Sequence, residues 1–179
     1  MVGAIEPNAT GLGPGGLVIA MVEHDRATAL QSFEQALALS PSYVLTLLLG
    51  AIALAYGGEA KRAIDYGEQA LRLSPAQDRM NFYSHHGLSI AYFLTGRYEE
   101  AANAAHRTIQ SGPNFSILHC LLAAPLVELG RLEEGNAAAS RVVTLQPSFS
   151  SAGCCAALAL AAALADLLQE TWREAGLLT

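Results

Sequence analysis

The sequence predicts an all-α fold, a solenoid of stacked helical hairpins, and three observations support this prediction. Prolines recur at a nearly constant interval, since Pro7, Pro41 and Pro75 are 34 residues apart. Pro113 follows after 38 residues and Pro147 after another 34. Stretches with apolar residues three or four apart fill the intervals, and glycine divides several of them in two. With 52% hydrophobic and 15% charged residues among 179, the chain can bury a substantial core.

The interval between the second and third prolines shows the predicted hairpin most clearly. Residues 43–56 are an apolar run that predicts the first helix. Gly57 and Gly58 follow as the turn, because glycine tolerates the left-handed conformation that ends many helices. Residues 59–73 predict the second helix, which ends there because the residue before a proline avoids helical angles. The next two intervals repeat this pattern, with turns at Gly96 and Gly130.

These intervals resemble the tetratricopeptide repeat, in which a small and a large residue recur in the first helix and an alanine recurs in the second. The matching positions are Ala51, Ser89 and Ala123 (small), Leu54, Tyr92 and Leu126 (large), and Ala29, Ala63, Ala101 and Gly135 (second helix). The resemblance covers residues 10–147. It implies a right-handed superhelix of about four tetratricopeptide hairpins, whose first helices line a concave face.

The two ends depart from this pattern. We expect an irregular segment at 1–14 as the tail of a missing repeat, a four-repeat domain at 15–147, and a C-terminal capping helix at 148–179. Glycine and proline are dense near residue 14, so only Gly16–Glu23 is predicted to be helical there. No glycine turn follows the last proline, and one helix is predicted from about Ser150 to Ala175 to cover the final hydrophobic face.

Longer phrases narrow the resemblance to one branch of these proteins. The phrases "FEQALALSPS", "HHGLSIAYFLTGRYEEAANAA" and "REAGLLT" are similar to tetratricopeptide regions of bacterial adenylate/guanylate cyclases and related signalling proteins. The similarity implies a signalling context but no cyclase activity, because the chain lacks a catalytic region. Pro7 closes a repeat whose helices are absent, which indicates a C-terminal piece of a larger protein.

Composition argues against several classes of function. Ten Lys and Arg residues scattered singly, in a chain of net charge −6, form no basic stripe for nucleic acid. The apolar runs 43–56 and 154–165 have 14 and 12 residues, whereas a membrane span needs about 20. Three cysteines form no even framework, and this indicates a reduced, cytoplasmic setting.

Motifs for chemistry are equally weak. His86 and Cys120 are predicted to face one groove, but no zinc-ligand spacing accompanies them. The glycine-rich "GLGPGG" lacks both the preceding strand and the Gly-Lys-Ser/Thr of a phosphate loop. We therefore expect a non-enzymatic protein, with no catalytic residue, no metal and no cofactor.

The predicted site is the concave groove, which should bind a protein or peptide partner as an amphipathic helix or an extended segment. Its lining residues are predicted to be Leu45, Leu48, Ile52, Tyr56, Tyr83, His86, Ile90, Phe93, Ile117, Cys120, Ala124 and Val127, with Val18, Met21 and Val22 from the first repeat. The Lys and Asn set of a chaperone-type carboxylate clamp is missing, so capture of a free acidic C-terminus in that manner is not expected.

An apolar groove of this kind should be covered, and three occupants stay open: the chain's own C-terminal helix, a second copy in a homodimer, or a partner segment. The alternative function is a small-molecule or lipid sensor, with Tyr56, Tyr83, His86 and Phe93 forming a pocket. A closed cavity would favour the sensor, and an open trough would favour peptide docking.

Overall fold

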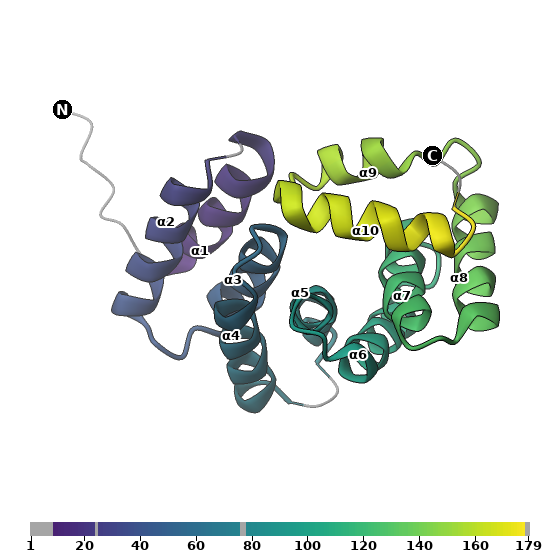
Figure 1. The fold of residues 1–179 in the computed structure, drawn as a ribbon. Helices are drawn as coiled ribbons and strands as arrows, with labels where there is room; N and C mark the ends of the chain where they lie inside the picture. Colours follow the sequence, from purple (N-terminus) through teal and green to yellow (C-terminus); the bar gives the residue numbers. More distant parts are fainter. Residues whose placement is uncertain (1–8, 24, 76–77, 178–179) are drawn as a thin grey trace.

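The structure, a computed structural model, describes residues 9–23, 25–75 and 78–177, and every element in that part is helical. The elements are α1 (Ala9–Val18), the π-helical turn η1 (Ile19–Glu23), α2 (Arg26–Leu39), α3 (Val44–Tyr56), α4 (Ala60–Leu73), α5 (Asn81–Leu94), α6 (Tyr98–Ser111), α7 (Ser116–Glu128), α8 (Leu132–Leu145), α9 (Ser151–Ala157) and α10 (Ala162–Glu174). The helices α1 to α8 pair as hairpins that follow one another around an arc (Figure 1). The predicted all-helical solenoid is confirmed.

The turns inside the hairpins form as the glycines predict. Gly58, Gly96 and Gly130 have φ angles of 83°, 72° and 71°, a region that favours glycine because it has no Cβ. In each turn the amide after the glycine donates a hydrogen bond to the carbonyl five residues earlier. These bonds run from Glu59 to Leu54, from Arg97 to Tyr92 and from Arg131 to Leu126, each with an N–O distance of 2.9 Å. The large residue of the repeat pattern thus also supplies the carbonyl that closes its own turn.

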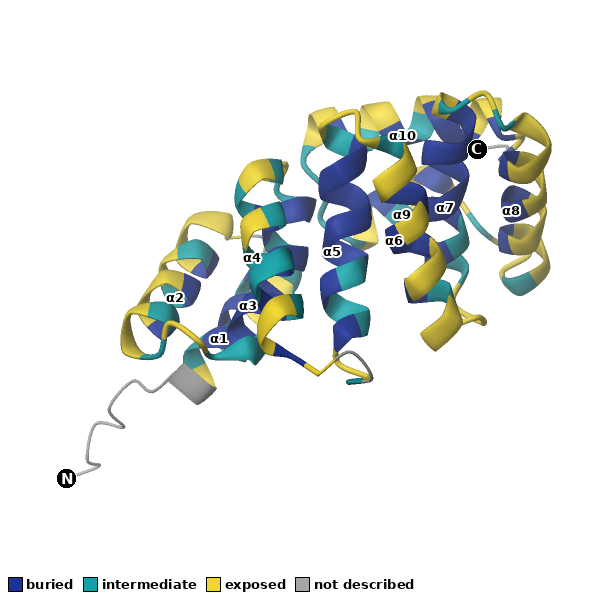
Figure 2. Cartoon of the chain, turned by 90° about the horizontal axis from the view of Figure 1, so that it is seen from below, coloured by how far each residue is buried: buried dark blue, intermediate teal, exposed yellow. Residues whose placement is uncertain are grey.

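Small residues let neighbouring hairpins approach closely. Ala51, Ala63 and Ala101 are fully buried. A Cβ added to Gly87 of α5 would come within 2.8 Å of the carbonyl carbon of Ala51, so α5 and α3 touch backbone to backbone. Figure 2 shows α5 buried along most of its length, whereas the outer sides of α2 and α8 are exposed. The first helices therefore form the inner layer of the arc and the second helices its outer layer.

The predicted first residue of the N-terminal helix is wrong. The sequence predicts an irregular stretch up to residue 14, yet α1 begins at Ala9 and continues through Pro14; residues 1–8 lie outside the described residues. Close packing explains the difference, because a Cβ on Gly16 would lie 3.1 Å from the Phe33 ring, and one on Gly13 would meet the Thr46 side chain. Glycines that weaken an isolated helix here allow α1 to pack directly on α2 and α3.

The single C-terminal helix predicted from Ser150 to Ala175 is also wrong, because the structure has two helices there, α9 and α10. Between them Ala159 has a φ of 50°, and it is the one positive-φ residue other than glycine in the described part of the chain. Contacts with distant residues hold this turn. The Ala161 amide donates to the Tyr56 carbonyl at 2.8 Å, and the Arg26 guanidinium donates to the Ala159 carbonyl at 2.7 Å.

Candidate functional site

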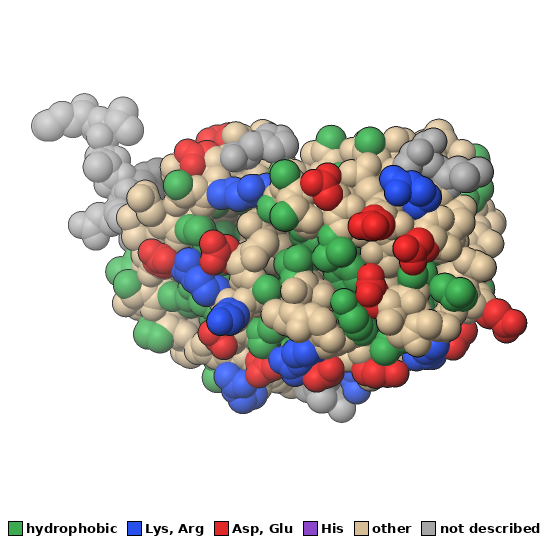
Figure 3. All heavy atoms as spheres, in the orientation of Figure 1, with side chains coloured by type: hydrophobic (Ala, Val, Ile, Leu, Met, Phe, Trp, Pro, Cys, Tyr) green, Lys and Arg blue, Asp and Glu red, His purple; other side chains and the backbone are tan. Residues whose placement is uncertain are grey.

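The concave face is lined by the first helix of each hairpin, and the C-terminal helices divide it into a covered part and an open part. Figure 1 shows α9 and α10 lying across the arc, from the ends of α2 and α3 to α7 and α8. Seen from the same side, hydrophobic side chains gather in the middle of the molecule and charged ones lie toward its edges (Figure 3). The chain's own C-terminal segment therefore fills a large share of the predicted groove.

The covered part is a packed core. Trp172 of α10 is 0% exposed, and its indole N–H donates to the Cys120 carbonyl of α7 at 2.8 Å. The Phe149 ring meets the Trp172 ring edge to face, with centroids 6.1 Å apart. Leu164 and Leu168 are buried on the same side of α10. These side chains join one hydrophobic cluster with five predicted groove residues of α5 and α7 that do not line the open cleft: Ile90, Phe93, Cys120, Ala124 and Val127. Ile52 and Tyr56 of α3 belong to the same cluster and also reach the open cleft.

The open part is a cleft of about 260 Å³, which we name the apolar cleft. Residues from all four first helices or their approaches line it: Leu17, Met21, Ile52, Tyr56, Phe82, Tyr83, His86, Phe115, Ile117 and Leu118. Phe115, just before α7, is 61% exposed, and Val22, next to Met21, is 71% exposed. The cleft therefore opens to solvent between apolar side chains.

Two polar side chains in the wall of the cleft, Tyr56 and His86, bond to each other. The Tyr56 hydroxyl and the His86 Nε2 are 2.7 Å apart, and both side chains are buried. Burial lowers the pKa of His86 to about 4 and raises the pKa of Tyr56, so both groups are neutral at pH 7. Phe82 packs edge to face against both Tyr83 and His86. The pair is thus satisfied within the fold, and the cleft offers an apolar surface.

Of the three predicted groove residues of the first repeat, Met21 lines the apolar cleft, and Val18 and Val22 are exposed. Of the twelve from the later repeats, the structure brings five together in the cleft: Ile52, Tyr56, Tyr83, His86 and Ile117. Five others lie in the covered core described above. The remaining two, Leu45 and Leu48, pack in a separate cluster with Leu47 and Ala70, where Leu48 is buried and Leu45 half-buried. The groove assigned from the repeat pattern is therefore divided among three environments.

Sequence reasoning missed Leu17, Phe82, Phe115 and Leu118 as lining residues. Phe82 lies within the longest proline interval, where four extra residues shift the repeat pattern, and Phe115 directly precedes its helix. Leu17 follows the glycine-rich stretch, for which the sequence predicts little helix. Both phenylalanines stand directly before or at the start of a first helix. An aromatic residue at such a position can reach the rim of the groove, and this pattern in the sequence could have identified them.

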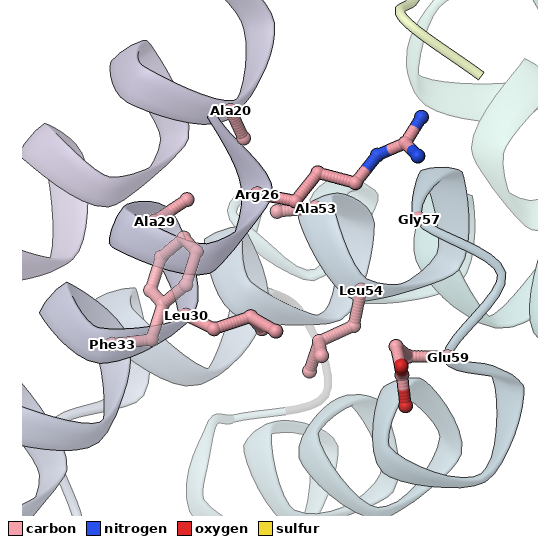
Figure 4. Close-up of a pocket in the computed structure, with 9 residues that line it drawn as sticks. All are labelled: Ala20, Arg26, Ala29, Leu30, Phe33, Ala53, Leu54, Gly57 and Glu59. Atoms are coloured by element: carbon pink, nitrogen blue, oxygen red, sulfur yellow. The ribbon is translucent and has the colours of Figure 1, made fainter. Parts of the chain in front are cut away.

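A second cavity lies between the first two hairpins and holds about 70 Å³. Figure 4 shows Phe33, Leu30 and Leu54 lining it, with the Arg26 guanidinium extending away from them. That guanidinium instead bonds the Ala159 carbonyl. This cavity is far smaller than the roughly 300 Å³ at which small-molecule sites begin, so it is a packing space between repeats.

Reactive groups are absent from the site as far as the described residues extend. No cluster of three His, Cys, Asp or Glu side chains that could hold a metal ion occurs among them. All three cysteines are unpaired, and burial raises the pKa of each thiol, most strongly for Cys120. A protonated, buried thiol is a poor nucleophile. No helix within the described ranges is long and apolar enough to cross a membrane.

Fold and site together define a helical-repeat protein with an apolar concave face. A curated relative, small glutamine-rich tetratricopeptide repeat-containing protein 2 of Mycosarcoma maydis, is 30% identical over 110 residues, which is 62% of this chain. The chain spans about 30% of that relative's length. No protein-family model matches the chain.

Two solved structures share the fold. The Cut9–Hcn1 hetero-tetramer of the APC/C matches with a TM-score of 0.66 and 15% identity, over 89% of this chain and 30% of that one. A thermophilic TPR protein of Thermus thermophilus matches with a TM-score of 0.61 and 19% identity, over 78% of this chain and 75% of that one. These likenesses confirm the tetratricopeptide-like solenoid, and they support the interpretation of the chain as a tetratricopeptide-repeat protein.

Proposed function

We propose that this protein is a non-enzymatic scaffold whose apolar cleft binds an apolar segment of a partner protein. The observation that carries this proposal is that α10 covers part of the concave face, whereas the apolar cleft stays open, with Phe115 exposed at its rim. Burying about 300 Å² of such surface would be worth on the order of 7 kcal/mol before entropy costs. This gain favours occupation by a partner segment, as an amphipathic helix or an extended stretch of chain.

The shape of the apolar cleft favours peptide docking over the small-molecule or lipid alternative. Its volume of about 260 Å³ lies below the roughly 300–1,000 Å³ of ordinary ligand pockets. A few apolar side chains projecting from a partner would fill it, whereas a lipid would leave much of its length in water. Because the rim is open, it also lacks the enclosure on which tight small-molecule binding depends.

Selection of peptides from a random phage-displayed library against the full chain tests this function. Phe115→Asp places a charge at the rim of the apolar cleft, and we expect it to abolish binding of the selected peptides. Leu132→Asp is the matched control, because Leu132 is similarly exposed but lies on the outer helix α8. Peptides that bind both variants equally, or a selection without binders, would contradict the proposal.

A homodimer is the other protein occupant to consider. If a second copy fills the apolar cleft, light scattering should give twice the chain mass, and Phe115→Asp should restore the monomer. A wild-type monomer that binds selected peptides supports a different partner.

We further propose a bacterial, cytoplasmic signalling context for this scaffold. Its support is the similarity of the phrases around residues 33–42 and 85–105 to repeat regions of cyclase-type signalling proteins. The three unpaired cysteines are consistent with a reducing compartment. Sequencing the coding region upstream of this chain tests the proposal, since a catalytic or DNA-binding domain in the same frame is the expected result.

A further inference from the structure

A polar pocket adjoins the apolar cleft on the other side of Phe82, which lines both. It holds about 190 Å³ between the start of α5 and the end of α6. We name it the basic pocket, after the residues that characterise it: Arg79, Asn81, His85 and Arg107, with one acid, Asp78.

The two arginines of the basic pocket, like Arg26, Arg141 and Arg173, have no acidic partner among the described residues. Arg62, Arg72, Arg97 and Arg131 each pair with a glutamate. Within the described part of the chain, Arg79 and Arg107 form no such ion pair, although both are exposed. The acid of the pocket, Asp78, forms hydrogen bonds within its own turn. Its carboxylate accepts from the Ser74 hydroxyl at 3.1 Å and from the Met80 amide at 2.9 Å. The pocket therefore carries an excess of positive charge in a protein of net charge −6.

Two further polar side chains, Asn81 and His85, line the basic pocket. Asn81 is 6% exposed; its amide nitrogen donates to the Pro75 carbonyl at 2.9 Å, but its Oδ1 has no hydrogen-bond partner. This oxygen is itself covered by the protein, so it is not an acceptor that a bound segment can reach. Burial and the nearby Arg107 guanidinium lower the pKa of His85, so the positive charge of the pocket comes from the two arginines.

We propose that the basic pocket binds an acidic side chain, aspartate or glutamate, of the same partner segment whose apolar residues enter the apolar cleft. The carboxylate pairs with the exposed guanidinium groups of Arg79 and Arg107. Because Phe82 lines both the apolar cleft and the basic pocket, the acidic residue of the partner should lie close to an apolar residue that enters the apolar cleft. This inference rests on the proposed function and adds the charge of the partner to it.

The test uses the peptides selected from the random library and measures their affinity by fluorescence anisotropy. We expect the selected sequences to be enriched in Asp or Glu at a fixed spacing from Leu, Ile, Met or Phe. The double variant Arg79→Gln/Arg107→Gln should weaken binding about tenfold, and added salt should weaken wild-type binding in the same direction. The double variant Arg141→Gln/Arg173→Gln removes the same charge from exposed sites elsewhere and should leave the affinity unchanged.

The outcomes separate this inference from the proposed function. If Phe115→Asp abolishes binding but the Arg79/Arg107 double variant does not change it, and acidic residues are not enriched, the inference is wrong and the apolar scaffold stands. If both double variants weaken binding equally, the effect is one of net charge and the inference is again wrong. If no peptide binds through Phe115, both proposals fall together.

Discussion

The middle hairpins and the two ends of this molecule are built on different principles. In α3–α8 each glycine turn closes through a bond to a carbonyl five residues earlier, so local sequence and final structure agree. At the C-terminal end, Leu160 makes the same bond to Cys155, but Ala159 occupies the left-handed position that glycine holds elsewhere. There the turn exists because Tyr56 and Arg26 hold it from across the arc. The repeats are therefore determined by residues close together in the sequence, whereas the turn at the C-terminal end depends on contacts between distant residues.

The largest expected effect comes from removing the anchor of the C-terminal end. Trp172→Ala deletes a fully buried ring and its bond to the Cys120 carbonyl, and should cost about 3–5 kcal/mol of unfolding free energy. Urea unfolding measures it, and hydrogen exchange should show α10 losing protection. Val143→Ala, at a half-exposed position of α8, is the control and should change stability little. A cost below about 1 kcal/mol would mean that α10 is not part of the core.

The second prediction concerns pH and the middle of the concave face. The folded pKa of His86 is about 4, below the ordinary value of 6.5, so the unfolded chain binds the proton more tightly. This contribution to stability is complete above pH 6.5 and is lost as the pH falls toward 4, by roughly 3 kcal/mol. Urea unfolding at pH 7 and pH 4 measures the loss. His86→Gln does not titrate and should lose correspondingly less; equal losses in both proteins would contradict the assignment.

A third prediction compares two helical glycines, one in each region. Gly87→Ala places a Cβ 2.8 Å from the Ala51 carbonyl carbon and should destabilise the protein by about 1–2 kcal/mol. Gly15→Ala in α1 meets nothing within 4 Å and should stabilise by up to about 1 kcal/mol through helix propensity. Thermal unfolding of the two variants should therefore shift in opposite directions, and a shift of the same sign would show that packing does not separate them.

The smallest expected effect is at the turn of the C-terminal end. Ala159→Gly relieves a φ of 50° and should stabilise the protein by roughly 0.5–1 kcal/mol. Ala163→Gly, at an exposed site inside α10, is the matched control and should destabilise by about 1 kcal/mol. Chemical unfolding measures both. Destabilisation by Ala159→Gly would mean that the turn carries no backbone strain.

Much of the middle of the molecule could be predicted from residue types alone. The helices α3 and α4 each begin one residue later than predicted and end at the predicted residue. The site was harder to predict. Ile52 and His86 line the apolar cleft, whereas Cys120 and Ala124 are fully buried and do not line it, although the repeat pattern treats all four as groove residues. Periodicity assigns a residue to a face of a helix, but it does not say what covers that face.

The sequence by itself determined the hairpins, their turns and the inner layer of first helices, because glycine at a left-handed position, proline after a helix and apolar spacing act within a few residues. Only the tertiary structure decided that α1 starts before Pro14, that the C-terminal segment breaks at Ala159, and that α10 packs on part of the groove. Each of these depends on contacts between residues far apart in the chain, such as Trp172 with Cys120 and Ala161 with Tyr56. The apolar cleft and the basic pocket are what that arrangement leaves uncovered.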